Sequence, residues 1–213
     1  MDVAEILKDP RVDKGCFRLV ANYESLDGYN AEKKRYFPYH CEADRDGLMT
    51  VGRGKALLNG EKFLTIGGVK CDLYKDGLTI EQVDRLYSET MAPRLKTVFE
   101  RIPHAKPHEY GALLSLFYNV ETPLLGGTVD DLHNAGAPKT AVAAKILEYH
   151  KANKKPVRGL WRRRGVEALY YLTGDIFLAN TPETEAAVFR RLAALGVKFK
   201  TPVFPTPKAK KPK

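Results

Sequence analysis

The chain has 213 residues, of which 44% are hydrophobic, and it carries a formal net charge of +9 with a pI near 9.4. This length and apolar content are enough for one sizeable core and argue against a globally disordered protein. The positive charge favours an anionic partner, either a nucleic acid, a membrane surface or an acidic polymer.

The N-terminal third combines one helix with short strands. Apolar residues at helical spacing in "CFRLVANYES" predict a helix over residues 16–25 that ends before Gly28. Residues 26–35 are polar and are expected to form a loop. From residue 36 to 70, glycines and prolines between short apolar pairs predict strands and tight turns. The run "YFPYHCEADRDGLMTVGRG" in particular predicts a tight hairpin that displays polar side chains.

The rest of the chain has helical periodicity. Thr79 and Gln82 fit a capping box, and Pro93 is expected to break or kink the helix that follows. Residues 107–120 begin with proline and are apolar almost all round, which predicts a buried central helix. Further helices are predicted over residues 128–134, 139–152 and 161–173, the last stopping at Gly174. The fold class is therefore α+β, with the strands confined to the N-terminal third.

A final helix is predicted with Thr181 as its N-cap, Pro182 in its first turn and Gly196 just after its end. The sequence that follows alternates proline and lysine, which predicts an extended cationic tail. Residues 179–213 thus form a C-terminal addition of one helix and a Lys/Pro-rich tail.

Cysteine and histidine usage argues against a metal site. Cys16, Cys41 and Cys71 lack CxxC spacing, so neither a disulfide framework nor a zinc site is expected, and a reducing compartment is the default. The five histidines lack HxxxH and HExxH spacing. We find neither a signal peptide nor an apolar run near the ~20 residues that a membrane span needs, so we expect a cytosolic protein without an export signal.

Glu24, Asp44 and Thr50 are the candidate catalytic group. A Glu at the end of a helix would face an Asp and a Thr on the hairpin. Two carboxyl groups across a cleft are the minimum for glycoside hydrolysis, since one donates a proton to the leaving oxygen and the other activates water or stabilises positive charge. In a chain with 26 acidic residues, such a pair alone is a weak signal.

Three motifs, in order, make the chain resemble the bacteriophage-type lysozymes of glycoside hydrolase family 24. The family pattern D-x-x-G-x-x-T-[IV]-G-x-G is filled from Asp44 to Gly54. "EYGALLSLFYNV" resembles the family's central helix, and "GLWRRRGVEALYYLTG" resembles its GLxxRRxxE helix. The likeness spans roughly residues 14–174. It implies a lysozyme-like fold with a small N-terminal β-hairpin lobe, a larger helical lobe and a cleft between them, and a catalytic domain over residues 1–178.

The resemblance also implies roles for single residues. Glu24 would be the proton donor, and Asp44 with Thr50 would position or activate the water. Arg163 would pair with Glu24 and orient its carboxyl group; Arg162 and Arg164 are neighbouring alternatives, and a solvated basic helix face is the ordinary reading of all three. The implied sugar contacts are Gly54, Tyr118 and Asn119. Trp161 is expected to be a core anchor rather than a sugar platform.

The chain departs from the family pattern in three places. "LDGYNAEKKRYF" is an insertion that lengthens the segment between Glu24 and Asp44. Lys55 stands where His is usual, and Glu121 follows "NV" where Gly is usual. The insertion makes Glu32 and Glu42 rivals for the proton donor. Glu24 is preferred because it ends an apolar-periodic helix, and Asp46 is the expected turn residue.

The function implied by the resemblance is that of an endolysin. Such a muramidase would hydrolyse the β-1,4 bond between N-acetylmuramic acid and N-acetylglucosamine in peptidoglycan, by an inverting course and without a cofactor. It would stay in the cytoplasm of the bacterial host until a holin gave it access to the periplasm. We expect a monomer whose partners are peptidoglycan and the anionic cell-wall surface, with no nucleic acid. The alternatives are lytic transglycosylation of the same bond and a non-catalytic module that binds wall or nucleic acid.

Overall fold

The computed structural model describes residues 6, 8–12, 14–24, 26–40, 48–120 and 128–204. The helices in chain order are α2 (Lys14–Tyr23), the 3-10 helix η1 (Leu58–Gly60), α3 (Ile80–Arg101), α4 (Pro107–Asn119), α6 (Val129–Asn134), α7 (Lys139–Leu147), α8 (Arg158–Thr173) and α9 (Pro182–Ala194). The strands are β1 (Tyr29–Asn30), β2 (Arg35–Tyr36), β3 (Tyr39–His40), β4 (Met49–Val51), β5 (Lys55–Ala56), β6 (Phe63–Ile66), β7 (Val69–Asp72), β8 (Lys151–Ala152) and β9 (Lys155–Pro156).

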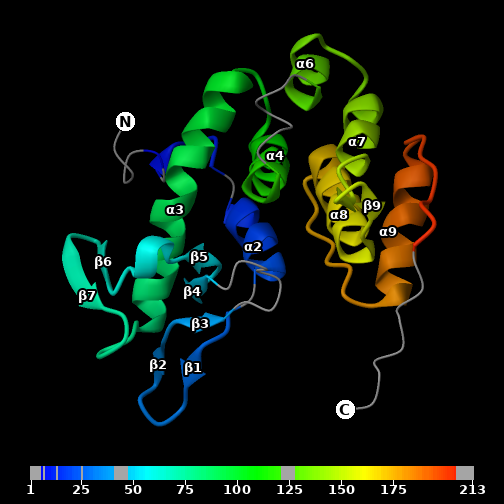
Figure 1. Cartoon of the computed structure of the whole chain (residues 1–213). Coiled ribbons are helices and arrows are strands. Elements are labelled where there is room, and N and C mark those ends of the chain that lie inside the picture. Colours follow the sequence, from blue (N-terminus) through cyan, green and yellow to red (C-terminus); the bar gives the residue numbers. More distant parts are fainter. Residues whose placement is uncertain are drawn as a thin grey trace, which may run out of the picture.

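The elements form a small β region and a larger helical region (Figure 1). Strands β1 to β7 lie beside the first half of α3, while α7, α8 and α9 lie side by side at the other end of the molecule. Helices α2 and α4 pack against each other between them, and α4 also packs on α8. This arrangement confirms the α+β, lysozyme-like fold class.

The β region is built from short antiparallel ladders. Strands β3, β4 and β5 form one sheet, in which Thr50 of β4 is paired with Tyr39 on one side and Ala56 on the other. Strands β6 and β7 form a second hairpin. Residues 26–35, expected to be a loop, contain most of a third hairpin, in which β1 pairs with β2. The ring centroids of Tyr29 and Tyr36 lie 5.0 Å apart across this hairpin. Such a cross-strand contact stabilises a hairpin, although the polar composition of the segment predicts a loop.

The strands are not confined to the N-terminal third, because β8 and β9 form a hairpin between α7 and α8. The predicted helix over residues 139–152 was therefore too long, since α7 ends at Leu147. The turn of this hairpin holds Asn153 and Lys154 at positive φ, a conformation that Asn tolerates and that suits a two-residue hairpin loop.

Helix α3 runs through Pro93 without a break. The Thr79–Gln82 capping box is confirmed, since Gln82 N donates to Thr79 Oγ1 at 3.1 Å and Thr79 N donates to Gln82 Oε1 at 2.8 Å. Proline removes one helical hydrogen bond and crowds the preceding turn. Met91, Ala92 and Leu95 are all buried around it. Packing of this apolar face holds the helix together and outweighs the local preference of proline.

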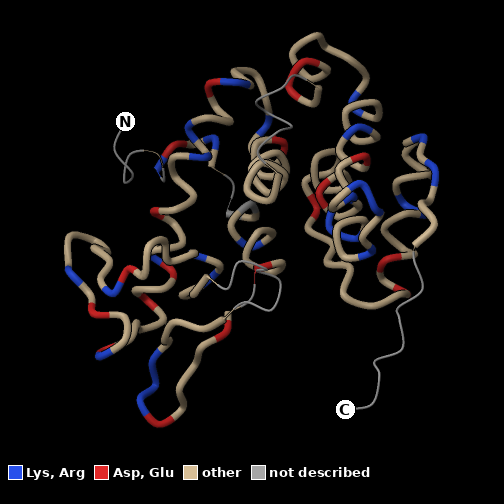
Figure 2. The backbone as a smooth tube through the Cα atoms, in the orientation of Figure 1, with Lys and Arg blue, Asp and Glu red and all other residues tan. Residues whose placement is uncertain are grey.

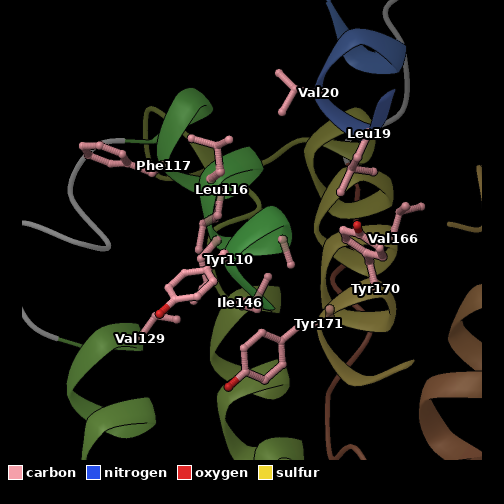
Figure 3. Close-up of a cluster of buried hydrophobic side chains, with 14 of the residues drawn as sticks. Leu19, Val20, Tyr110, Leu116, Phe117, Val129, Ile146, Val166, Tyr170 and Tyr171 are labelled. Carbon is pink, nitrogen blue, oxygen red and sulfur yellow. The ribbon is translucent and has the colours of Figure 1, made fainter. Parts of the chain in front are cut away.

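The main core lies among the helices (Figure 3). Leu19 and Val20 of α2 meet residues of α4 and α8 there, and Ile146 of α7 joins them. Helix α4 is buried from Glu109 to Phe117, as its all-round apolar sequence predicts. Each fully buried apolar side chain contributes on the order of 1.5–3 kcal/mol. This packing fixes the C-terminal ends of α2 and α4 relative to α8.

Helix α9 is attached to α8 through aromatic rings. Trp161 stacks on Phe189 with ring centroids 4.5 Å apart and planes 5° from parallel, and Phe199 approaches it edge-on at 6.0 Å. Gly165 makes room for this contact, since a Cβ there would lie 2.7 Å from the Phe189 ring. Trp161 is only 3% exposed, so it is a core residue, as expected.

Candidate active site

Glu24 directly follows the last residue of α2. Its backbone amide donates to the Val20 carbonyl at 3.2 Å, so it continues the helical turn. Because Leu19 and Val20 are anchored in the core, the end of this helix is held firmly. The Glu24 side chain itself is 19% exposed. A carboxyl group is thus presented at the surface from a rigid support.

A pocket of about 330 Å³ lies beside Glu24. Tyr23 and Glu24 line it from the end of α2, and Asn119 lines it from the end of α4. The start of α8 contributes Val157, Gly159, Leu160 and Arg163. The pocket therefore lies where three helix ends meet. It contains a carboxyl group, an amide and a guanidinium group, which together can hold and protonate a polar ligand.

Arg163 contacts Glu24 directly. Arg163 Nη1 donates to Glu24 Oε1 at 2.9 Å, and Arg163 Nη2 donates to the Ser115 carbonyl at 3.2 Å. Burial by itself disfavours the charged guanidinium, but the carboxylates of Glu167 and Glu24 outweigh burial and raise the pKa of Arg163. Arg163 therefore remains a positive charge fixed beside Glu24.

Glu167 lies behind Arg163, one helical turn further along α8. Its Oε1 accepts hydrogen bonds from Arg163 Nε at 3.1 Å and from Ser115 Oγ at 2.6 Å. Its other oxygen, Oε2, lies 3.1 Å from Arg164 Nη1 in an ion pair. Glu167 and Arg164 are both fully buried.

The three neighbouring arginines have different partners. Arg164 Nη2 donates to Asn119 Oδ1 at 2.7 Å, which orients the amide that lines the pocket. Burial lowers the pKa of Arg164 to about 10, so this side chain is still charged at neutral pH. Arg162 points the other way and donates to Glu185 of α9 at 3.1 Å. Among the described contacts, Arg163 is thus the arginine of this group that meets Glu24.

The turn between β4 and β5 closes on Glu24 from the β region. Gly54 has φ +79°, and a Cβ at this position would lie 3.1 Å from Glu24 Oε2 and 3.5 Å from the Tyr118 hydroxyl. Tyr118 Oη donates to the Arg53 carbonyl at 3.3 Å, which ties the turn to the end of α4. Burial, followed by the negative charge of Glu24, raises the pKa of Tyr118. The turn can approach this closely because residue 54 is glycine.

The structure places most, but not all, of the predicted site residues together. Glu24, Gly54, Tyr118, Asn119 and Arg163 form one cluster through the contacts above. Thr50 is buried on β4, with its backbone in the sheet and 5% of its surface exposed. Asp44, Asp46 and Glu42 lie outside the described residues. Glu32, a rival for the proton donor, is exposed in the turn between β1 and β2.

Ser115 and Glu167 are contacts that the sequence prediction did not assign to the site. Each had a signal. Ser115 is the one hydroxyl within the run "ALLSLF", and a polar residue on an otherwise buried helix needs a partner. Glu167 follows Arg163 by four positions on a helix, which places the two side chains on one face.

Within the described ranges, no group of three or more His, Cys, Asp or Glu side chains is placed to hold a metal ion. In the same part of the chain, no helix has the length and apolar character to cross a membrane.

Comparison with known proteins gives one consistent result. The sequence profile of the phage lysozyme family matches residues 30–167. The endolysin from Escherichia coli O157:H7 phage FAHEc1 superposes with a TM-score of 0.56 at 22% identity, covering 77% of this chain and 94% of that one. A P22 lysozyme mutant gives 0.57 at 21% identity, with 76% and 98% covered. The muramidase domain of SpmX from Asticaccaulis excentricus gives 0.56 at 19% identity, with 76% and 97% covered. No match was found among curated protein sequences.

Proposed function

Because the chain belongs to the phage lysozyme family, and is thus a glycoside hydrolase that degrades peptidoglycan, we propose that it is an endolysin muramidase. Its substrate bond would be the β-1,4 linkage between N-acetylmuramic acid and N-acetylglucosamine. The observation that supports this most is the environment of Glu24, a carboxyl group at the rim of a pocket, fixed from behind by Arg163.

In this proposal, Glu24 is the general acid. It donates its proton to the glycosidic oxygen as the bond breaks and the sugar gains oxocarbenium character. Asp44 and Thr50 then position a water molecule on the opposite face of the sugar ring or stabilise the cation. The proposal includes an inverting course. In inverting enzymes the two carboxyl groups stand far enough apart to leave room for that water.

Three further residues would hold the glycan. The Asn119 amide faces the pocket with its oxygen engaged by Arg164, which leaves its NH₂ group as a donor toward the acetamido or hydroxyl oxygens of a sugar. The Tyr118 hydroxyl lies on the same side of Glu24 as the β4–β5 turn. Gly54 lets a sugar ring come close to the backbone of that turn.

Positive charge would bring the enzyme to its polymer. Lys and Arg occur in both the β region and the helical region (Figure 2), and the net charge is +9. Cell walls carry carboxylates and often phosphates, so a cationic enzyme is held near its substrate by an attraction that salt screens over a Debye length of about 8–10 Å. Wall binding should therefore weaken as ionic strength rises.

Endolysin action also implies an order of events in the host. The enzyme would stay in the cytoplasm until a holin opens the membrane, and then reach the periplasm. We expect cells that express this chain alone to stay intact and to lyse when a holin is co-expressed. Lysis without any membrane-permeabilising protein would contradict this part of the proposal.

Product analysis tests the bond and the reaction together. Purified peptidoglycan digested in water enriched in ¹⁸O should give fragments with a reducing N-acetylmuramic acid end that carries the label. A reducing N-acetylglucosamine end would show that the other glycosidic bond is cut. Unlabelled 1,6-anhydro products would show lytic transglycosylation, in which the sugar's own hydroxyl attacks. Glu24→Gln serves as the control and should give none of these products.

A further inference from the structure

We propose that Glu167 is a positioning residue that sets the orientation of two pocket groups at once, the carboxyl group of Glu24 and the amide of Asn119. It acts through two arginines and does not itself line the pocket. The inference rests on the proposed role of Glu24 as proton donor. It adds the buried contacts that keep Glu24 aligned with Asn119, one of the proposed sugar contacts.

The contacts form one continuous path through the protein interior. Glu24 is bound by Arg163, Arg163 by Glu167, Glu167 by Arg164, and Arg164 by Asn119. Both ends of the path, Glu24 and Asn119, line the same pocket. Its middle is shared by neighbouring residues of a single helix, α8, because Arg163 and Arg164 lie four and three positions before Glu167.

Charge balance makes Glu167 the central member. Glu167 contacts both buried guanidinium groups, those of Arg163 and Arg164, whereas Glu24 is paired with Arg163. Without Glu167, the only other carboxyl group of the path is that of Glu24, which lies at the pocket rim and is needed there as the proton donor. Each arginine would then gain by moving toward Glu24 or toward water, and either movement would shift a pocket group. A buried ion network adds little net stability because desolvation offsets attraction, whereas a fixed geometry is a use such networks are known to have.

Ser115 fixes the carboxylate of Glu167. Its hydroxyl donates to Oε1 at 2.6 Å, the same oxygen that accepts from Arg163. The carbonyl of Ser115 accepts from Arg163 Nη2. One residue of α4 therefore holds both members of the Arg163–Glu167 pair. Arg163 uses Nε, Nη1 and Nη2 for three different partners, which leaves its guanidinium group a single orientation.

The test compares kcat and KM of purified full-length variants on soluble peptidoglycan fragments, with the folded fraction measured by thermal unfolding. Glu167→Gln keeps the shape of the side chain and removes its charge. We expect kcat to fall about 10- to 100-fold, the effect of misplacing a catalytic group by roughly 1 Å. KM should rise about threefold to tenfold, the equivalent of one hydrogen bond.

Two further variants test separately the contacts that lead from Glu167 to Glu24 and those that lead from Glu167 to Asn119. Arg164→Met removes the donor to Asn119 and should raise KM by a similar factor, with a much smaller fall in kcat than Glu167→Gln. Ser115→Ala should lower kcat in the same direction as Glu167→Gln but less, and should leave KM nearly unchanged. Val166→Ala is the matched control, since Val166 is buried on α8 beside Glu167 and is apolar. It should lower the unfolding temperature and leave kcat and KM per folded molecule as in the wild type.

The outcomes are distinguishable. If the folded fraction of Glu167→Gln has the kinetic constants of Val166→Ala, Glu167 is only structural and the inference is wrong. If Glu167→Gln does not fold, the split between Ser115→Ala and Arg164→Met decides, and equal effects of both on kcat and KM would overturn the inference. If the wild type itself does not cleave the fragments, the proposed function fails instead.

Discussion

Arg163 and Glu24 lie 139 positions apart in the sequence, and a hydrogen bond of 2.9 Å joins Arg163 Nη1 to Glu24 Oε1. The contact connects α8 to the end of α2, with α4 packed against both helices. The Glu24 carboxyl group therefore takes its final position only when both distant segments have folded. Its chemistry depends on the helical core as much as on the local sequence around it.

Replacing Arg163 with Lys should lower kcat by about 10-fold or more. Lysine keeps the charge, but a single ammonium group cannot satisfy the three partners that the guanidinium fork reaches. Steady-state hydrolysis of peptidoglycan fragments measures the effect. Arg162→Lys is the control, because Arg162 pairs with Glu185 on the other side of the helix. Equal activities of the two variants would show that the fork geometry at Arg163 has no role.

Gly54→Ala should reduce activity more than stability. The new Cβ would lie 3.1 Å from Glu24 Oε2 and would either push the carboxyl group or occupy space meant for a sugar. The positive φ adds about 1–2 kcal/mol of backbone strain. Gly60→Ala isolates that strain, since Gly60 has φ +69° and open space around its Cβ. We expect the two variants to have similar free energies of unfolding, with activity lost only in Gly54→Ala. An equal loss of activity in both variants would show that the space between Gly54 and Glu24 is not needed for catalysis.

The stabilising contribution of the Glu109 carboxylate should be lost in acid. Burial by itself would raise the pKa of the Glu109 carboxyl, but hydrogen bonds from the Lys139 ammonium and the Lys106 amide outweigh burial and hold that pKa below its ordinary value of 4.5. A lowered carboxyl pKa stabilises the folded state above pH 4.5, and this contribution is lost as pH falls through the folded-state pKa.

Urea unfolding at several pH values checks this sign. Glu109→Gln should be less stable than the wild type at pH 7 by roughly 1–3 kcal/mol, the range for a hydrogen-bonded charged group. The difference should shrink as the pH is lowered below 4.5. A difference that stays constant down to pH 3 would mean that the charge of Glu109 contributes nothing.

Phe189→Ala should destabilise the protein by about 2–3 kcal/mol, because Phe189 stacks on the buried Trp161 and joins α9 to α8. Chemical denaturation gives the free energy of unfolding. Phe177→Ala removes the same ring from an exposed position and should change it by less than about 0.5 kcal/mol. If both variants are equally stable, the C-terminal helix is not held by this stack.

Much of this architecture is readable in the sequence because its signals are local. The Thr79–Gln82 capping box, the proline start and all-round apolar character of α4, and the glycine stop of α8 each depend on a few adjacent residues. The sequence predicts a loop where β1 and β2 form a hairpin, and it predicts a break or kink at Pro93, where α3 continues without a break. Both depend on tertiary contacts, across the strands in one case and on the buried face around Pro93 in the other.

The candidate site likewise has residues that local sequence signals identify and contacts that only the tertiary structure determines. Glu24 was chosen because it ends an apolar-periodic helix, which is a local argument. The different partners of Arg162, Arg163 and Arg164 could not be read from "WRRRG", since consecutive helix positions point in directions about 100° apart and the relative placement of α2, α4 and α9 decides what each meets. Sequence periodicity does not contain that placement.

The most direct test of the central claim is turbidity loss of chloroform-permeabilised Gram-negative cells treated with wild type, Glu24→Gln or Glu32→Gln. Glu32 is the matched control, an exposed acid in the hairpin turn that follows α2. The account predicts rapid clearing by wild type and Glu32→Gln, and none by Glu24→Gln. Clearing by Glu24→Gln at the wild-type rate would contradict it and would move the proton donor to another acid.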